Sequence, residues 1–146
     1  MAVSSNISFS EKVAQGFMRA PSGAGGGLPE FLGVKITDAG PGTMTGQFEV
    51  RPELLTPIDN MHGGVLSAFC DHMLGCVCYP AMKPGQWAAT TEFKINLTAP
   101  VTQGVVEARA EIVNMSRTQA VVRIDLTNEG RTVAMAQGTV TVRDPR

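Results

Sequence analysis

Two groups of residues in the middle of the chain could act together on the carbonyl group of a substrate. The first is the tripeptide His62-Gly63-Gly64, and the second is Asp71, seven residues after the last of these glycines. Glycines at a helix start leave backbone N–H groups accessible at the positive end of the helix dipole, where an anion or a developing oxyanion is stabilised. The alternative is an ordinary helix start, because two glycines alone are a weak signal.

Asp71 stands in a segment that is otherwise apolar, with Phe69 and Met73 close by. A buried carboxylate without a partner is costly, and no Lys or Arg occurs between residues 60 and 82 to pair with it. We therefore expect Asp71 to be buried and retained for chemistry. The alternative is a partly exposed aspartate at the helix edge, beside the small side chain of Ser67 at the i−4 position.

The spacing of the two groups has a consequence for how they could cooperate. Gly64 and Asp71 lie roughly 10 Å apart along one helix axis, at about 1.5 Å per residue. One reacting carbonyl cannot contact both, since each catalytic group must lie about 3 Å from it. If both serve one reaction, a twofold dimer must place the Gly63–Gly64 end of one helix beside Asp71 of the other, which makes two equal sites.

The pattern around these groups predicts a long helix from about Gly64 to Tyr79, ended by Pro80. Six strand-like runs flank it, at residues 33–38, 43–50, 87–97, 105–115, 119–128 and 132–142. Short breaks between the last four predict an antiparallel meander with one apolar face, and the helix is the only element apolar enough to cover that face. The predicted fold class is α+β, with a curved antiparallel sheet wrapped around one long central helix.

Residues 1–32 predict an N-terminal helix and a Gly-rich connector ahead of the main domain, residues 33–146. Ser8 and Glu11 match the S-x-x-E capping box, so we expect a helix from about Phe9 to Arg19. The run PSGAGGGLPE is not followed by Gly-Lys-Ser/Thr, and it predicts a flexible connector rather than a phosphate loop.

The composition argues against several classes of protein. A net charge of −1 without a basic run makes nucleic acid an unexpected partner. No apolar run reaches the ~18 residues of a membrane span, and the first residues are too polar for a signal peptide, so we expect a cytoplasmic protein without membrane contact. Cys70, Cys76 and Cys78 form no CxxC pair, which predicts buried, reduced thiols and no metal site.

The stretches HGGVLSAFCDHMLG and TTEFKINLTAPV resemble the hotdog-fold acyl-CoA thioesterases of the phenylacetate-degradation (PaaI-like) branch. The family pattern is HGG, an acidic residue nine positions after the histidine, and a strand bearing Thr or Ser that ends near a proline. Here the acidic residue is Asp71, and the strand that bears Thr90 and Thr91 ends near Pro100. In order of elements the resemblance covers roughly residues 33–142, but its specific part is about forty residues long.

This resemblance implies a homodimer, often a dimer of dimers, that hydrolyses acyl-CoA thioesters without a metal or other cofactor. It implies Asp71 as nucleophile or general base, the Gly63 amide as oxyanion donor, and His62 as the residue that orients the loop or the thioester. The family's hydroxyl position falls on Thr90. Strand alternation instead favours Thr91, and both remain candidates.

One departure from the family concerns the side chain that polarises the substrate. Many relatives carry Asn or Gln six residues before the histidine, where this chain has Thr56, and Asp59 stands where a glycine is common. Asn60 is the candidate substitute. The remaining candidate substrate-binding residues are Gly64, Ser67 and Arg117, the last of which either meets a CoA phosphate or is plain surface.

Two other functions stay open at this point. A non-catalytic acyl-CoA-binding hotdog module is favoured by Thr56 and disfavoured by Asp71, because a binding protein gains nothing from a costly carboxylate. A hotdog dehydratase acting on acyl thioesters would need a histidine and an acid on different elements and a different motif.

Overall fold

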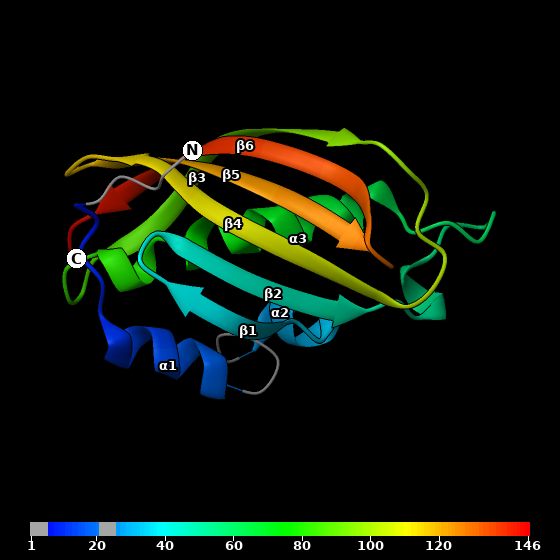
Figure 1. Ribbon diagram of the computed structural model, residues 1–146, viewed down its shortest axis with the longest axis horizontal. Coiled ribbons are helices and arrows are strands. Elements are labelled where there is room, and N and C mark those ends of the chain that lie inside the picture. Colours follow the sequence, from blue (N-terminus) through cyan, green and yellow to red (C-terminus); the bar gives the residue numbers. More distant parts are fainter. Residues whose placement is uncertain (1–5, 21–25) are drawn as a thin grey trace.

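The computed structural model describes residues 6–20 and 26–146, and it shows one antiparallel sheet with a long helix against one of its faces (Figure 1). The strands, in chain order, are β1 (Lys35–Gly40), β2 (Thr43–Glu49), β3 (Trp87–Leu97), β4 (Val105–Met115), β5 (Gln119–Asn128) and β6 (Arg131–Arg143). The helices are α1 (Glu11–Arg19), α2 (Gly27–Leu32) and α3 (Gly63–Cys76), with 3₁₀ turns η1 (Pro52–Leu54) and η2 (Tyr79–Ala81). The predicted α+β fold with a central helix is confirmed.

The strand order across the sheet is β1-β2-β4-β5-β6-β3, so the prediction of a four-stranded meander is wrong in one respect. Of the four strands in that prediction, β4, β5 and β6 follow one another as neighbours, whereas β3 pairs with β6 and not with β4. Residues 98–104 connect β3 to β4, and seven residues can span the three strand spacings of about 4.8 Å each. In this order β3 is an edge strand, and its later part runs along the top of the sheet in Figure 1.

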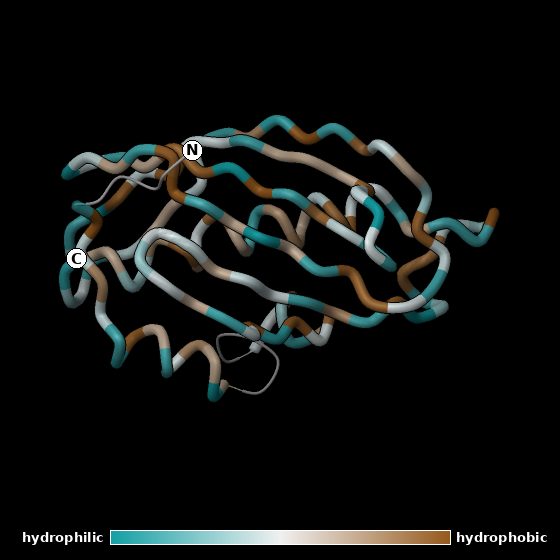
Figure 2. The backbone as a smooth tube through the Cα atoms, viewed as in Figure 1, coloured by the Kyte–Doolittle hydropathy of each residue, from teal (hydrophilic) through white to brown (hydrophobic). Residues whose placement is uncertain are grey.

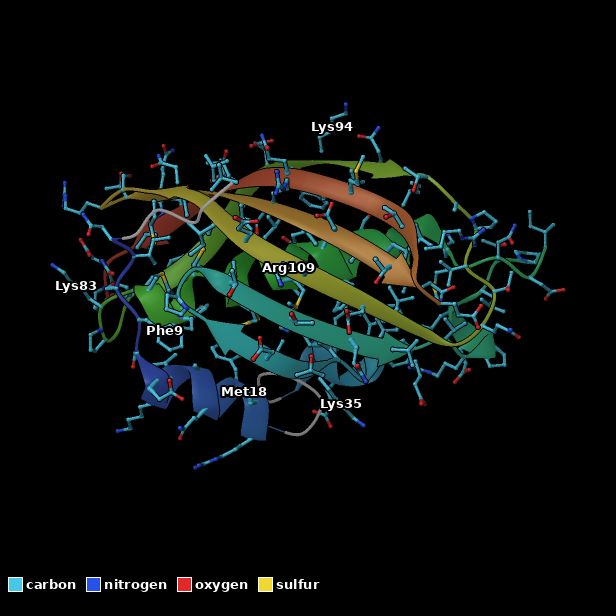
Figure 3. The ribbon with its side chains drawn as sticks, viewed as in Figure 1. Phe9, Met18, Lys35, Lys83, Lys94 and Arg109 are labelled. Atoms are coloured by element: carbon cyan, nitrogen blue, oxygen red, sulfur yellow. The ribbon has the colours of Figure 1, made fainter. Side chains whose placement is uncertain are left out.

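The core lies between the inner face of the sheet and α3. Every second residue of β4 from Val106 to Ile112 is buried, and Figure 2 shows the matching alternation of apolar and polar residues along this strand. Charged side chains such as Lys94 and Arg109 project from exposed positions of the sheet (Figure 3). The apolar side chains that α3 buries against the sheet are Leu66, Phe69, Cys70, Met73, Leu74 and Cys76. The remaining side chains of α3 are therefore the ones that can contact solvent or a ligand.

Helix α3 begins at Gly63 and ends at Cys76, three residues before its predicted end at Tyr79. The chain then turns through η2, which contains Pro80. Proline lacks an N–H, so Pro80 cannot donate to the carbonyl of Cys76 four residues earlier, and the helix ends at Cys76. The shortened helix leaves Tyr79 on a separate turn beside the end of α3.

Helix α1 begins two residues later than predicted, and its cap is Ser10 rather than Ser8. The Ser10 hydroxyl accepts the N–H of Val13, 3.4 Å away, whereas the Ser8 hydroxyl donates to the carbonyl of Ala81 at 2.7 Å. The capping-box interpretation is therefore wrong, because Glu11 is the first helical residue and not the third.

The predicted connector differs from the structure where the structure describes it. Residues 21–25 lie outside the described residues, but residues 27–32 form the short helix α2, which the sequence did not predict. The guanidinium of Arg51 donates hydrogen bonds to the carbonyls of Phe31 and Leu32 and lies 4.8 Å from the centre of the Phe31 ring. These contacts fix the end of α2 to the chain that follows β2.

Candidate functional site

Asp71 and Thr90 lie on the wall of one cavity of about 880 Å³, which we call the Asp71 cavity. Helix α3 and strand β3 supply most of its wall, and α1 and η2 each add one aromatic residue. The lining residues are Phe17, Asp71, His72, Gly75, Cys76, Tyr79 and residues 88–93. The structure thus joins two candidate catalytic residues that lie nineteen positions apart in the sequence.

Asp71 is exposed in the single chain, so the prediction that it is buried is wrong. Its neighbours Cys70, Met73 and Leu74 in α3 are buried, whereas the Asp71 side chain is exposed at the cavity. Among the described residues it makes no hydrogen bond or ion pair, which leaves its carboxylate oxygens available to a ligand.

Thr90 and Thr91 are separated by an irregularity in the pairing of β3 with β6. Thr90 lies opposite Val140 and Glu92 lies opposite Thr139, so Thr91 has no partner of its own in the ladder. This bulge ends the simple alternation on which the choice of Thr91 relied. Thr90 is half-buried, whereas Thr91 is exposed, with its hydroxyl 2.5 Å from that of Thr141.

A glycine makes this bulge possible. A Cβ added to Gly138 of β6 would lie 2.5 Å from both the carbonyl oxygen of Glu92 and the Cβ of Phe93. Only a residue without a side chain allows the two strands to approach so closely. The Thr90 position therefore depends on a residue far away in the sequence, which local alternation cannot reveal.

The start of α3 distinguishes the two glycines of the HGG motif. His62 is the N-cap, and its Nδ1 accepts the N–H of Gly64 at 2.9 Å. The N–H of Gly63 is the first of the helix and has no acceptor within it, and in the described part of the chain it donates to no other group. The N–H of Gly63 is thus free to bind an acceptor from outside the helix, and His62 caps the helix start.

Gly63 lines a second, smaller space of about 330 Å³, which we call the Gly63 hollow. Its wall also includes the candidate Asn60. The other lining residues are Met61, Leu66 and residues 97–101. An amide side chain is therefore available beside the candidate oxyanion donor.

Three of the candidate substrate-binding residues have other surroundings. The hydroxyl of Thr56 is buried and has no hydrogen-bond partner among the described residues, and it lines neither space. The hydroxyl of Ser67 donates to the carbonyl of Gly63 at 2.8 Å. Arg117 is exposed in the turn between β4 and β5. Asp59 adopts a φ of +59°, a conformation that glycine adopts readily, and this accounts for glycine being common there.

The Asp71 cavity and the Gly63 hollow lie at opposite ends of β3. A Cβ added to Gly63 would lie 2.7 Å from Leu97, and one added to Gly75 would lie 4.0 Å from Ala88. Helix α3 therefore runs antiparallel to β3, with its start beside the end of the strand. The single chain keeps the Gly63 amide and the Asp71 carboxylate apart, as the helix spacing predicts.

The cavity residues that were not foreseen as site residues include Phe17, His72 and Tyr79. His72 follows Asp71 directly, so its position was a usable signal. Phe17 belongs to α1, and the packing of α1 against β1 and η2 brings it to the cavity. No local pattern in the sequence could have indicated that contact.

Burial keeps the cysteine and the histidine of the cavity uncharged. Burial raises the pKa of Cys76 to about 12, and the neighbouring Cys78 adds to this shift. Burial also lowers the pKa of His72, against the smaller opposing effect of the Asp71 charge. The Sγ atom of Cys76 lies 3.3 Å from Nε2 of His72. A protonated thiol therefore contacts a neutral imidazole at pH 7.

Two further properties concern residues 6–20 and 26–146 as a whole. No group of three or more His, Cys, Asp or Glu side chains comes together there in a way that could hold a metal ion. Nor does this part of the chain contain a helix that is both long enough and apolar enough to cross a membrane.

Comparison with known proteins finds a CoA thioester hydrolase and other thioesterases among the similar proteins. A curated relative, the 1,4-dihydroxy-2-naphthoyl-CoA hydrolase of Listeria monocytogenes, is 26% identical over 121 residues, covering 82% of this chain and 98% of the relative. A thioesterase structure from Haemophilus influenzae has a TM-score of 0.75 and 25% identity, covering 79% of this chain and 81% of that one. A phenylacetic acid degradation-related protein from Ralstonia eutropha shares the fold, with a TM-score of 0.75 and 22% identity over 78% of this chain and 88% of its own.

The family assignment rests on a match over more than half of the chain. The model of the thioesterase superfamily matches residues 59–135, a range that includes the HGG motif, Asp71 and Thr90. The predicted resemblance is confirmed: the chain belongs to the thioesterase superfamily, and it is a thioester hydrolase with the hotdog fold.

Proposed function

We propose that the protein hydrolyses acyl-CoA thioesters to the free acid and CoA at sites shared between the two subunits of a homodimer. The observation that carries this proposal is the exposed Asp71 carboxylate, which lines one cavity together with Thr90. The name of the Listeria relative identifies its substrate as a thioester of coenzyme A. The match to that relative covers 82% of this chain.

The edge position of β3 supports the shared site. An edge strand carries backbone N–H and C=O groups without a partner, and a second copy of the chain can pair with them. Antiparallel pairing of two β3 strands about a twofold axis sets the Leu97 end of each against the Trp87 end of the other. Since Gly63 lies beside Leu97, this arrangement brings it toward Asp71 of the partner subunit.

The chemistry divides between these two groups. The Gly63 N–H donates to the thioester oxygen as it becomes negative. Asp71 either attacks the carbonyl carbon, giving an acyl-enzyme that water then hydrolyses, or removes a proton from the attacking water. In both routes the C–S bond breaks and the thiolate of CoA leaves, to be protonated as the free thiol. In this proposal the hydroxyl of Thr90, which lines the same cavity as Asp71, holds the attacking water or the carboxylate.

Asn60 takes the role of the side chain that polarises the substrate carbonyl in this proposal. It lines the Gly63 hollow, whereas the hydroxyl of Thr56 is buried elsewhere. His62 contributes indirectly, since it holds the N–H of Gly64 and leaves the N–H of Gly63 free. Arg117 remains a candidate contact for a CoA phosphate.

The function is tested by the release of free thiol from a panel of short-chain, long-chain and aromatic acyl-CoAs. We expect hydrolysis of at least one member with a kcat/KM in the ordinary enzyme range, above about 10⁴ M⁻¹s⁻¹. The competing function is a binding module without catalysis. Tight binding of acyl-CoA by calorimetry, with no thiol released from any member of the panel, would establish that alternative instead.

A second prediction concerns the assembly. We expect light scattering at low micromolar concentration to show a dimer, or a dimer of dimers, and no active monomer, because neither subunit alone unites Gly63 with Asp71. Replacing the exposed Leu97 by Lys at the proposed interface should weaken the dimer and the activity together. A monomer with full thioesterase activity would contradict the shared site.

A further inference from the structure

The outward face of β3 carries two opposite charges near the middle of the strand. Glu92 and Lys94 are both exposed and are the only charged residues of β3, and Figure 3 shows Lys94 projecting outward at the top of the sheet. The Glu92 carboxylate accepts a hydrogen bond from the Thr139 hydroxyl at 2.6 Å, and Lys94 lies opposite the uncharged Gln137. Neither charge forms an ion pair with the residues that the structure describes. They lie two positions apart, on one face of an edge strand.

The inward face of β3 is incompletely covered. Phe93 and Ile95 are only half-buried, and Leu97 is 53% exposed. The inward-facing Ala134 and Ala136 of the neighbouring β6 are buried. Apolar side chains therefore lie at the free edge of the sheet, where a further strand would cover them.

A second copy of β3 can pair with this edge in only a few registers. The shared site of the proposed function needs both α3 helices on the same side of the joined sheet, so outward-facing residues must lie opposite outward-facing residues. The twofold axis then passes beside one residue of the strand, which faces its own copy. An axis at Glu92 or at Lys94 sets two like charges directly opposite each other, which is unfavourable. An axis at Phe93 instead sets Glu92 of each subunit opposite Lys94 of the other.

We propose that Glu92 and Lys94 fix the register of the dimer interface by forming two symmetrical ion pairs, with Phe93 on the twofold axis. This inference rests on the proposed function, because it takes the partner of β3 to be a second copy of the chain. In this register Leu97, which lines the Gly63 hollow, lies opposite residues 88–89 of the partner subunit, which line its Asp71 cavity. The two charges thus select an alignment in which the two halves of the site adjoin.

The ion pairs act on the choice of register more than on the strength of the dimer. Exposed ion pairs contribute little to stability, because water and salt screen them. Main-chain hydrogen bonds and the cover over the apolar side chains of β3 supply most of the stabilisation, and they are similar in neighbouring registers. Like charges placed opposite each other penalise the wrong registers.

Disulfide cross-linking tests the register directly. Glu92→Cys and Lys94→Cys place thiols at the two outward positions, while the chain's own cysteines are all buried. When these two variants are mixed and oxidised, we expect a disulfide between subunits, because the two thiols lie directly opposite each other and the second ion pair is kept. Glu92→Cys mixed with Asn96→Cys is the matched control, since those thiols lie on a diagonal and should not join. A link in the control, or none in the first mixture once labelled subunits show exchange, overturns the register.

Charge reversal tests whether the ion pairs select the partner. Glu92→Lys and Lys94→Glu each create two like-charge pairs, so each should raise the Kd of its own dimer about tenfold at low salt. Mixing these two variants restores both opposite-charge pairs. Mixed dimers should then rise from the half expected for random exchange to about 90%. The controls Glu107→Lys and Lys35→Glu reverse exposed charges on other strands and should leave the dimer unchanged.

The outcomes separate this inference from the proposed function. If native mass spectrometry finds only the random half of mixed dimers from Glu92→Lys and Lys94→Glu, the inference is overturned and thioester hydrolysis stands. A monomeric wild type also overturns the inference. If the subunits sort by charge but no thioester is cleaved, the interface is established and the proposed function is refuted.

Discussion

Replacing Asp71 by Asn is expected to reduce kcat/KM for thioester hydrolysis by at least ~100-fold, the lower range for the loss of a general base. The substitution keeps the size of the side chain and removes its charge, so neither nucleophilic attack nor proton removal remains possible. The Asp71 side chain is exposed and makes no hydrogen bond or ion pair among the described residues, so the free energy of unfolding should change by less than about 0.5 kcal/mol. Thiol release and thermal unfolding measure the two effects.

A matched control is available on β1. Asp38 is also exposed, and Asp38→Asn removes the same charge from a position outside both spaces of the site. We expect this control to retain the activity and the melting temperature of the wild type. If Asp71→Asn stays active while its melting temperature falls, Asp71 has a structural role and the proposed mechanism is wrong.

The second prediction combines two inactive variants. Gly63→Pro deletes the proposed oxyanion donor, and Asp71→Asn deletes the carboxylate, so each homodimer should lose at least ~100-fold in activity. When the two proteins are mixed and exchange subunits, one site of each mixed dimer pairs an intact Gly63 with an intact Asp71. The other site of that dimer carries both defects.

Twofold symmetry gives the amount of activity that should return. Random exchange makes roughly half of the dimers mixed, and each mixed dimer has one good site out of two, so activity should recover to roughly a quarter of the wild-type value. Dimers labelled with two fluorophores would show that exchange has taken place. If exchange occurs and no activity returns, Gly63 and Asp71 do not meet across the interface.

The structure indicates how Gly63→Pro can be tolerated and controlled. Proline is accepted at the first position of a helix, where the N–H has no acceptor within the helix. The added Cβ would meet the end of the Leu97 side chain, which is 53% exposed and can move aside. Gly63→Ala adds the same Cβ but keeps the N–H. It should therefore retain at least ten times the activity of Gly63→Pro if the N–H is the catalytic group.

The sequence by itself determined the six strands and the central helix of this fold, and it identified the candidate site residues. Period-two and helical patterns located all six strands and the central helix to within a few residues, because those patterns depend on which side chains face one core. The motif from His62 to Asp71 lies on a single helix, so its residue types and its spacing of roughly 10 Å follow directly from helix geometry.

Only the tertiary structure decided how these elements come together. It placed β3 beside β6 instead of β4, which depends on the route of residues 98–104 rather than on any local preference. It also put Asp71 at the surface of the chain, because exposure depends on what packs against a helix and not on the apolar residues beside it in the sequence.

The same reason applies to the details of the site. The bulge that favours Thr90 over Thr91 depends on Gly138 of the neighbouring strand, and the aromatic wall of the cavity depends on Phe17 from α1. Both contacts join residues that are far apart in the chain. Whether such contacts form depends on how the elements pack in three dimensions. A linear pattern reports only the preferences of neighbours along the chain, so it identified the candidate catalytic residues but not the cavity that surrounds them.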